Sequence, residues 1–137
     1  MLGEYAVRAM IYLAGLPAGK TTSIAEISTA WEIPETFLRK ISAQLAKAGL
    51  ITTQRGSRGG IRLAKPGEAI TLLEVIEVVE GKISLNKCMI ASDFCHRAPY
   101  CGVHNVWAEA QYAVRSILAS KTLHQLAIES DVRKAAS

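Results

Sequence analysis

The sequence has no apolar run long enough to cross a membrane. Its uncharged stretch from residue 9 to residue 19 contains Gly15 and Pro17 and is far shorter than the ~20 apolar residues that a spanning helix needs. The N-terminus carries Glu4 ahead of its apolar residues instead of a basic segment, so it predicts no signal peptide. We therefore expect a cytoplasmic protein with no membrane partner.

The motifs of common enzymes are also missing. The chain has no phosphate-binding glycine motif and no evident nucleophile beside a general base, so we predict that it is not an enzyme and has no small-molecule substrate. Aromatic residues make up only 6% and charged residues 20% of the 137 residues, whereas 50% are hydrophobic, with a mean hydropathy of +0.19. This composition excludes a disordered chain, fits one domain and leaves apolar surface for an oligomer contact.

The positive charge is concentrated in the first half of the chain. Residues 1–65 contain nine Lys and Arg against four Asp and Glu, whereas residues 66–137 contain seven against eight. A basic first half predicts a module that binds a polyanion, joined to a nearly neutral part. Ordinary solvated lysines and arginines are the alternative that charge alone leaves open.

Helical signals fill the first 48 residues. Residues 4–16 are apolar on almost every side and predict a largely buried helix. A capping-box pattern, Ser-Ile-Ala-Glu, opens a second helix over residues 23–30. A third helix is expected over residues 34–48, with Pro34 as its first helical residue and Gly49 after its end.

The third helix has an apolar and a polar face. The apolar positions recur at helical spacing and predict the side that packs on the core: Phe37, Leu38, Ile41, Leu45 and Ala48. The opposite face presents mostly polar and charged side chains: Glu35, Thr36, Arg39, Lys40, Ala43 and Lys47.

A basic hairpin follows the third helix. Residues 50–54 and 61–63 are β-rich, and the glycine-rich turn between them carries Arg55, Ser57 and Arg58. Helix, short turn, helix and basic hairpin in this order predict a mainly α fold with a small β-hairpin wing, a winged helix-turn-helix module. The same elements without a nucleic-acid role are the alternative.

A winged helix predicts contacts with double-stranded DNA. The second helix of the pair enters the major groove, where Arg39 or Lys40 can pair with guanine and Thr36 can reach a thymine methyl group, beside Glu35. The wing side chains, including Arg55, can then contact phosphates or the minor groove.

A further helix is predicted after the wing. A capping box opens it over residues 71–80, and its apolar face is expected to be Leu72, Leu73, Ile76 and Val79.

The longest helical pattern, over residues 103–120, favours a dimer contact. Its apolar residues recur at spacings of three and four: Val103, Val106, Trp107, Ala110, Val114, Ile117 and Leu118. A stripe this long exceeds what so small a core needs, so we expect a homodimer through this helix, with an ordinary core helix as the alternative. The last residues, from Ser130, are expected to fray.

The three cysteines lie close together in the pattern C-x6-C-x5-C-x2-H. Cys88, Cys95 and Cys101 are followed by His104, one helical turn beyond the last thiol. An odd cysteine count in a cytosolic protein argues for metal binding or redox chemistry and against a disulfide framework. Three thiolates and a fourth donor suit an iron-sulfur cluster or zinc. Thiols that sense oxidation without a metal, and an enzyme that uses a cluster as a Lewis acid, are weaker alternatives.

The chain resembles the Rrf2 family of bacterial transcription regulators. The resemblance rests on the cysteine triplet and on four stretches of sequence: Glu4–Ala14, Leu45–Leu50, Arg55–Gly60 and Ile70–Ile76. It implies a homodimer with a winged-helix DNA-binding domain, a long dimerisation helix and a roughly palindromic operator. In IscR-like and NsrR-like members it also implies an iron-sulfur cluster near the domain junction.

The resemblance also implies the cluster ligands. Cys88, Cys95 and Cys101 match the cluster cysteines, and His104 matches the histidine that completes the 2Fe-2S site of IscR-like members. Glu4 matches the acidic residue that NsrR-like members supply from the opposite subunit, so it is the alternative ligand. Six residues, where the family commonly has five, separate the first two cysteines. We expect a 2Fe-2S cluster, with a 4Fe-4S cluster as the alternative.

Four regions are expected along the chain. Residues 1–65 form the winged helix-turn-helix region, 66–81 a connecting helix, 82–103 the cysteine loop that binds the cluster, and 104–137 the dimerisation helix and C-terminal tail. Together they predict a regulator whose operator binding responds to redox state, iron or nitric oxide through the cluster. A winged-helix regulator with zinc or redox thiols in place of the cluster is the alternative.

Overall fold

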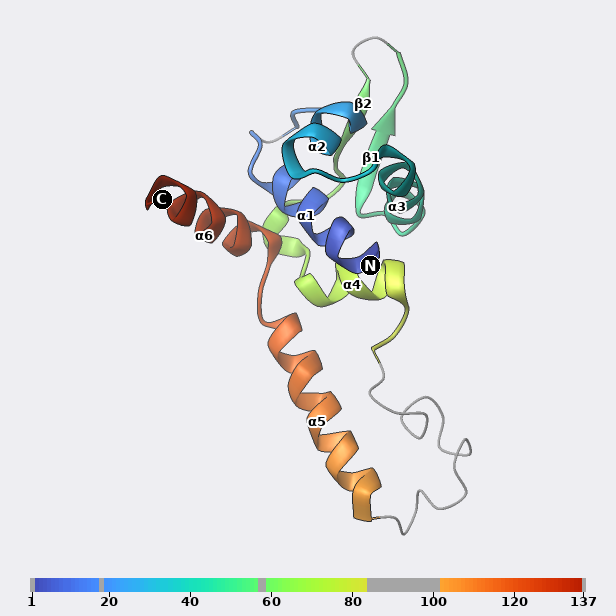
Figure 1. Cartoon of the computed structure of the whole chain (residues 1–137), viewed down its shortest axis with the longest axis vertical. Coiled ribbons are helices and arrows are strands. Elements are labelled where there is room, and N and C mark those ends of the chain that lie inside the picture. The colour runs from blue at the N-terminus through green and yellow to red at the C-terminus, as the bar shows by residue number, and fades with distance from the viewer. Residues whose placement is uncertain (1, 18, 57–58, 84–101, 137) are drawn as a thin grey trace.

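The computed structural model describes residues 2–17, 19–56, 59–83 and 102–136. Within these residues the chain is mainly α-helical with one β-hairpin, as predicted (Figure 1). Figure 1 shows α1 to α4 and the hairpin gathered in one body, α5 extending away from it, and α6 returning beside α1. The elements are α1 (Leu2–Ala14), α2 (Ile24–Trp31), α3 (Glu35–Lys47), β1 (Ile51–Gln54), β2 (Gly60–Leu63), the short 3-10 helix η1 (Gly67–Ala69), α4 (Leu72–Glu80), α5 (Gly102–Ala119) and α6 (Leu123–Ala136).

Helix α1 lies at the centre of the body because almost every side of it is apolar. Its residues Ala6, Ala9 and Met10 are buried, and α3, α4 and α6 pack around it. The buried side chains that surround it come from all parts of the body: Ile27, Ile33, Leu38, Ile41, Leu45, Ile51, Ile61, Ile70, Val75, Val79 and Leu123. Each fully buried side chain of this kind contributes roughly 1.5–3 kcal/mol, so the core holds α3 firmly against α1.

The turn between α2 and α3 is short and well defined. Glu32 adopts a left-handed conformation (φ 52°, ψ 48°), and the Ile33 N–H donates to the Ser28 carbonyl at 3.1 Å. Ile33 is 1% exposed and fixes the turn to the core. α3 begins at Glu35, so Pro34 is its N-cap residue and not its first helical residue as predicted. At either position the N–H that proline lacks would have no partner within the helix.

The two predicted capping boxes differ. At α2, Ser23 Oγ accepts from the Glu26 N–H at 3.1 Å, but the Glu26 carboxylate accepts from the Thr22 hydroxyl instead of from the Ser23 N–H. The first box is therefore only half formed, because the buried Thr22 hydroxyl competes for the carboxylate. At α4 the box is complete, with reciprocal hydrogen bonds of 3.2 and 3.4 Å between Thr71 and Glu74.

The hairpin is anchored to the body at its base. β1 and β2 pair antiparallel in the register Ile51 opposite Leu63, which confirms the predicted wing. The Thr22 and Ile61 backbones exchange two hydrogen bonds, of 3.0 and 2.7 Å, so β2 is also joined to the loop between α1 and α2. A Cβ at Gly60 (φ 149°) would lie 2.2 Å from the Thr22 carbonyl oxygen, so only glycine allows this approach.

Two predicted apolar faces differ from the observed ones. Phe37 was expected in the core, but it is 46% exposed in the first turn of α3, where its ring stacks on Tyr5 at a centroid distance of 5.8 Å. In α4 the buried side chains are Val79, as predicted, and Val75, which was not on the predicted face, whereas Leu72 and Ile76 line an apolar groove against α1. The physical reason is that α4 is short and apolar on most sides, so helical spacing alone does not reveal its core side.

An elbow between α5 and α6 is bonded to the body through its backbone. The Leu72 N–H donates to the Lys121 carbonyl, and the Leu123 N–H donates to the Ile70 carbonyl, both at 2.9 Å. These bonds fix the point at which the chain turns from one helix into the next.

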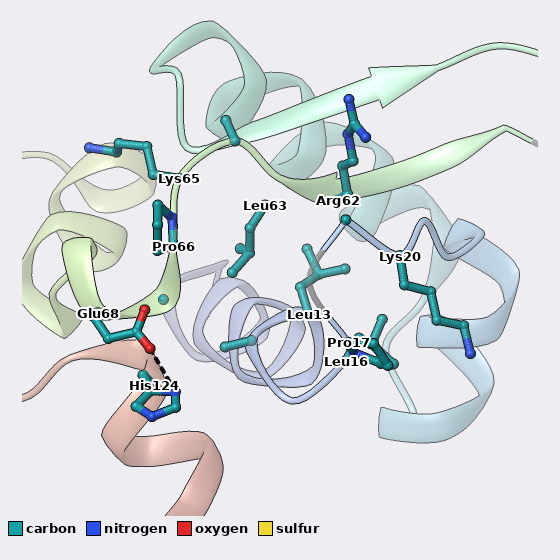
Figure 2. A pocket seen from close by; sticks show the side chains of 14 residues that line it. Leu13, Leu16, Pro17, Lys20, Arg62, Leu63, Lys65, Pro66, Glu68 and His124 are labelled. Atoms are coloured by element: carbon teal, nitrogen blue, oxygen red, sulfur yellow. Dashed lines mark ion pairs between the residues drawn. The ribbon is translucent and has the colours of Figure 1, made fainter.

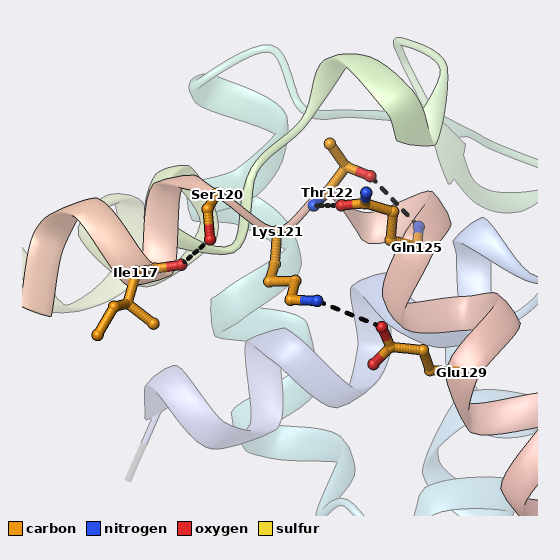
Figure 3. Close-up of polar contacts among 6 residues, drawn as sticks. All are labelled: Ile117, Ser120, Lys121, Thr122, Gln125 and Glu129. Carbon is orange, nitrogen blue, oxygen red and sulfur yellow. Dashed lines mark hydrogen bonds and ion pairs between the residues drawn. The ribbon is translucent and has the colours of Figure 1, made fainter.

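Helix α6 continues to residue 136, so the prediction that the chain frays from Ser130 is wrong. At the N-terminus of α6, Thr122 and Gln125 cap each other with hydrogen bonds of 3.0 and 3.2 Å (Figure 3). Lys121 pairs with Glu129 at 3.4 Å two turns into the helix. The helix then packs along α1.

Candidate nucleic-acid interface and metal ligands

The polar face of α3 is exposed, as predicted. Glu35, Thr36, Arg39 and Lys40 all lie in solvent, whereas Leu38 on the opposite face is buried. Arg39 and Glu35 form an ion pair one turn apart at 3.5 Å, with side chains 67% and 50% exposed. Such an exposed pair contributes little to stability and is readily exchanged for another partner. α3 therefore offers a row of accessible polar groups.

Unpaired positive charges gather on the same half of the molecule. Among the side chains that the structure describes, five exposed cations of the first half have no ion pair: Lys20, Lys40, Lys47, Arg55 and Arg62. After residue 66, by contrast, Glu68, Glu74 and Glu77 each have a basic partner. The excess positive charge of the first half of the sequence thus forms a surface of unpaired cations on α3, the hairpin and the adjacent loop. Such a surface favours binding of a polyanion.

The wing is described up to its tip. Arg55 follows β1 and is exposed, and the turn continues through Gly56 with φ 108°. Ser57 and Arg58, also predicted to contact DNA, lie outside the described residues. A Cβ at Gly59 would lie 2.1 Å from the Gln54 carbonyl oxygen, so the return of the tight turn requires glycine.

The predicted metal ligands are only partly described. Cys88, Cys95 and Cys101 lie outside the described residues, and the remaining chain holds no cluster of three or more metal-binding side chains. The Nδ1 atom of His104, in the first turn of α5, is buried and has no hydrogen-bond partner. A buried polar atom of this kind normally has a partner. Because a ring nitrogen completes a set of three thiolates, these residues fit an iron-sulfur cluster or zinc.

The alternative ligand, Glu4, has another partner within the protomer. Its carboxylate accepts a hydrogen bond from Arg8 one turn along α1, and its side chain is 57% exposed. Next to it, the Gly3 N–H donates to Glu80 at 2.9 Å and joins the start of α1 to α4. The structure thus brings Glu4 to Arg8 and not to His104, so its predicted role as a ligand requires the opposite subunit.

The long helix α5 has no buried residue within the protomer. Its most exposed apolar side chains are Val103, Val106, Tyr112 and Ile117, at 56%, 64%, 76% and 67%. An ordinary core helix is therefore excluded. An exposed apolar surface of this length is typical of a contact with another protein.

An ion pair that the sequence did not indicate joins α5 to α4. Arg115 donates to Glu77 Oε2, which also accepts from the Ile83 N–H at 3.0 Å. Burial raises the pKa of Glu77, but the hydrogen bonds from Arg115 and Ile83 and the charges of Arg115 and Lys82 outweigh burial and hold that pKa below its ordinary value. Glu77 is therefore charged at neutral pH. The partners lie 38 residues apart, too far for helical spacing to relate them.

Replacing Glu77 with glutamine is expected to lower the free energy of unfolding by about 1–3 kcal/mol at neutral pH, because Arg115 would face no charge in a part-buried position. Since the native pKa of Glu77 lies below the unfolded value near 4.5, the pair stabilises fully above that pH, and its contribution is lost as pH falls through the native pKa. Urea unfolding across this range measures both effects. Glu109→Gln, at an exposed position on α5, is the control, and equal losses in both variants would contradict the prediction.

Comparisons with known proteins cover nearly the whole chain. The Rrf2 family, described as an iron-dependent transcriptional regulator, matches residues 2–129. CymR of B. subtilis, the global cysteine regulator, is 31% identical with a TM-score of 0.79, over 94% of this chain and 95% of that chain. IscR of T. potens is 26% identical with a TM-score of 0.77, over 95% and 85%. The oxidized form of Staphylococcus aureus CymR is 27% identical with a TM-score of 0.72, over 93% of each chain.

The comparisons agree with the fold. The similar chains are winged-helix regulators, which matches the helices and hairpin described above.

Among the described helices, none combines the length and apolarity that crossing a membrane demands.

Proposed function

Because this chain belongs to the Rrf2 family of iron-dependent transcriptional regulators, we propose that it is a homodimeric, cytoplasmic bacterial regulator whose grip on a DNA operator is controlled by an iron-sulfur cluster. The protein is a transcription regulator and not an enzyme. Members of the family bind DNA and are typically dimers.

DNA contacts are proposed for the exposed row on α3 and for the wing. Arg39 can leave its weak pair with Glu35 and donate two hydrogen bonds to a guanine, with Lys40 as the neighbouring candidate. Thr36 presents a methyl group and a hydroxyl on the same face. Arg55, with Ser57 and Arg58, would hold the phosphates, since an exposed cation loses little in leaving water for a charged partner.

Replacing Arg55 with alanine is expected to lower the slope of log affinity against log salt concentration by about one unit, because one phosphate contact disappears. Sequence preference should be unchanged, since phosphate contacts carry no base information. Fluorescence anisotropy with operator and scrambled duplexes over a salt series measures both. An unchanged slope would remove Arg55 from the interface.

The dimer is proposed to form through α5. Two copies related by a twofold axis would present two α3 helices to successive major grooves, so the operator should be roughly palindromic. The pair between Glu77 and Arg115 fixes α5 to α4, and α4 in turn packs on α1 and α3. The orientation of α5 therefore sets the separation of the recognition helices.

The proposed cluster ligands are Cys88, Cys95, Cys101 and His104, with Glu4 of the opposite subunit in place of His104 as the alternative. A bound iron-sulfur cluster supplies an iron centre that responds to redox potential, iron supply and nitric oxide. Cys101 immediately precedes α5 and His104 lies in its first turn, so two of the four ligands are carried at the start of the dimer helix. Loss or modification of the cluster would therefore change how Cys101 and His104 are held and would shift α5, the helix that sets the distance between the two α3 helices.

The buried, unpartnered Nδ1 of His104 is the observation that supports this proposal, because a ring nitrogen with no other partner at the start of α5 is available to a metal. The test compares operator binding by anaerobically purified holoprotein and by apoprotein. The expected result is a brown protein whose operator affinity or sequence preference changes when iron is removed. Equal affinity and equal sequence preference in both forms would refute control by a cluster. A colourless protein with stoichiometric zinc would show that the cysteines hold a structural zinc ion and not an iron-sulfur cluster.

A further inference from the structure

A cavity of about 440 Å³ lies between the wing and α6 (Figure 2). Its walls come from the end of α1, the loop that follows α1, strand β2 with the segment after it, and the first turn of α6. It contains none of the proposed α3 contacts or metal ligands. Its volume falls in the range of small-molecule sites, roughly 300–1,000 Å³.

The floor of the cavity is apolar. Figure 2 shows Leu13 and Leu63 close together at its centre, with Leu16 and Pro17 on one side and Pro66 on the other. A ligand with an aliphatic body would bury apolar surface on these side chains, which is favourable in proportion to the area removed from water.

Positive side chains outnumber negative ones at the cavity. Glu68 is the acidic residue in the described lining, and its carboxylate lies 3.3 Å from His124 Nδ1, which neutralises it only when the imidazole is protonated. Lys65 pairs with Glu74 at 3.7 Å. Within the described part of the chain, Lys20 and Arg62 have no ion pair, and both line the cavity. Both residues are exposed, and Figure 2 shows their side chains pointing away from Leu13 and Leu63 in different directions. Long, exposed side chains at a rim can fold over a ligand that carries the opposite charge.

We propose that this cavity binds a small monocarboxylate with an aliphatic body and that the bound anion changes the affinity of the protein for DNA. The aliphatic chain lies on the leucine and proline floor, and the carboxylate accepts hydrogen bonds from Arg62, with Lys20 beside it. A monocarboxylate fits better than a phosphate ester because the Glu68 carboxylate also lines the cavity and would repel a second negative charge.

The expected effect of the bound anion on DNA affinity follows from the elements that form the cavity walls. Arg62 and Leu63 are wing residues, whereas His124 lies in the first turn of α6, which follows α5 after the elbow. At one end the walls touch closely, since a Cβ at Gly67 would lie 3.2 Å from the His124 nitrogen. A ligand in the open part would bridge the wing and α6 and so favour one placement of the wing. The binding step is independent of any cluster.

The test uses the full chain and hexanoate, with hexylamine and hexanol as probes of equal length. Isothermal titration calorimetry is expected to show hexanoate binding in the millimolar range and at least about tenfold weaker binding of the other two, because a charge-assisted hydrogen bond is lost. Arg62→Gln should weaken hexanoate binding by about tenfold. Lys47→Gln removes the same charge from an exposed site outside the cavity and should change hexanoate binding little.

Several results would overturn the proposal. Absence of hexanoate binding, equal binding of hexylamine, or equal losses in the two variants would each exclude an anion site in this cavity. If Arg62→Gln lowers operator affinity while hexanoate binding is unchanged, Arg62 is a phosphate contact and the site is refuted. Operator titrations with and without saturating hexanoate test the second part of the proposal, the change in DNA affinity. Equal operator affinities would refute that change even when the anion binds.

Discussion

Replacing Val106 and Ile117 together with aspartate is expected to leave a folded monomer whose operator affinity is about a hundredfold lower or more. Both side chains are exposed in the protomer, at 64% and 67%, so the fold does not depend on them. They lie eleven residues apart and therefore on the same side of α5. A carboxylate buried without a partner in the dimer contact costs several kcal/mol, and separated protomers lose the benefit of binding two half-sites at once, roughly 10²–10⁴ in affinity.

Sedimentation velocity and fluorescence anisotropy measure the two effects. The control is Asn105→Asp with Ser116→Asp, which adds the same charge to exposed positions about 100° around α5 from the tested pair. The control protein should remain dimeric. A dimeric V106D/I117D protein, or a monomeric control, would show that the contact surface is not the predicted stripe.

Replacing Cys95 with serine is expected to abolish the visible absorption and almost all bound iron, and to give the operator affinity of the apoprotein. A serine hydroxyl is a much harder and less acidic donor than a thiol, and iron-sulfur clusters depend on thiolates. The fold should persist, because the body of α1 to α4 and the hairpin has its own core. Absorption spectra, iron analysis and operator titration of the anaerobically purified protein test this, and full retention of the cluster would exclude Cys95 as a ligand.

The fourth ligand is assigned by a second pair of variants. His104→Ala should change the absorption spectrum and speed cluster loss, because the buried Nδ1 has no other partner. Glu4→Gln should leave the spectrum unchanged, because Glu4 already has Arg8 as its partner. The reverse outcome would assign the fourth position to the opposite subunit's carboxylate.

The elements of the fold were largely predictable because their signals are local. Ser23 and Thr71 mark helix starts, and glycines follow the ends of α3 and α4, so no distant contact was needed to place them. The exposure of Phe37 was not predictable, since it depends on where Tyr5 of α1 lies. The full length of helix α6 was missed because α6 packs on α1, which lies more than 100 residues away in the sequence.

The candidate site divides in the same way. The exposed row of Glu35, Thr36, Arg39 and Lys40 follows from helical periodicity alone, and the structure confirms its exposure. The pair of Glu77 with Arg115 and the cavity between the wing and α6 involve segments 38 or more residues apart in the sequence. Only folding brings such groups together, so no spacing rule could reveal them. The roles assigned to the cysteines and to the wing tip stay predictions.

The backbone anchoring at the elbow gives α5 the mechanics of a lever. Its fulcrum lies at the C-terminal end of α5, where the hydrogen bonds of Lys121 and Leu123 and the ion pair of Arg115 with Glu77 hold the helix to the body. The arm beyond Arg115, residues 102–114, is about 20 Å long at 1.5 Å per residue. A tilt of only ~10° at the fulcrum would sweep the far end, next to Cys101, through ~3–4 Å. In the opposite direction, a force applied near the cysteines would act on the body through this long arm. The amplification thus depends on one clamp made of two peptide hydrogen bonds and one ion pair.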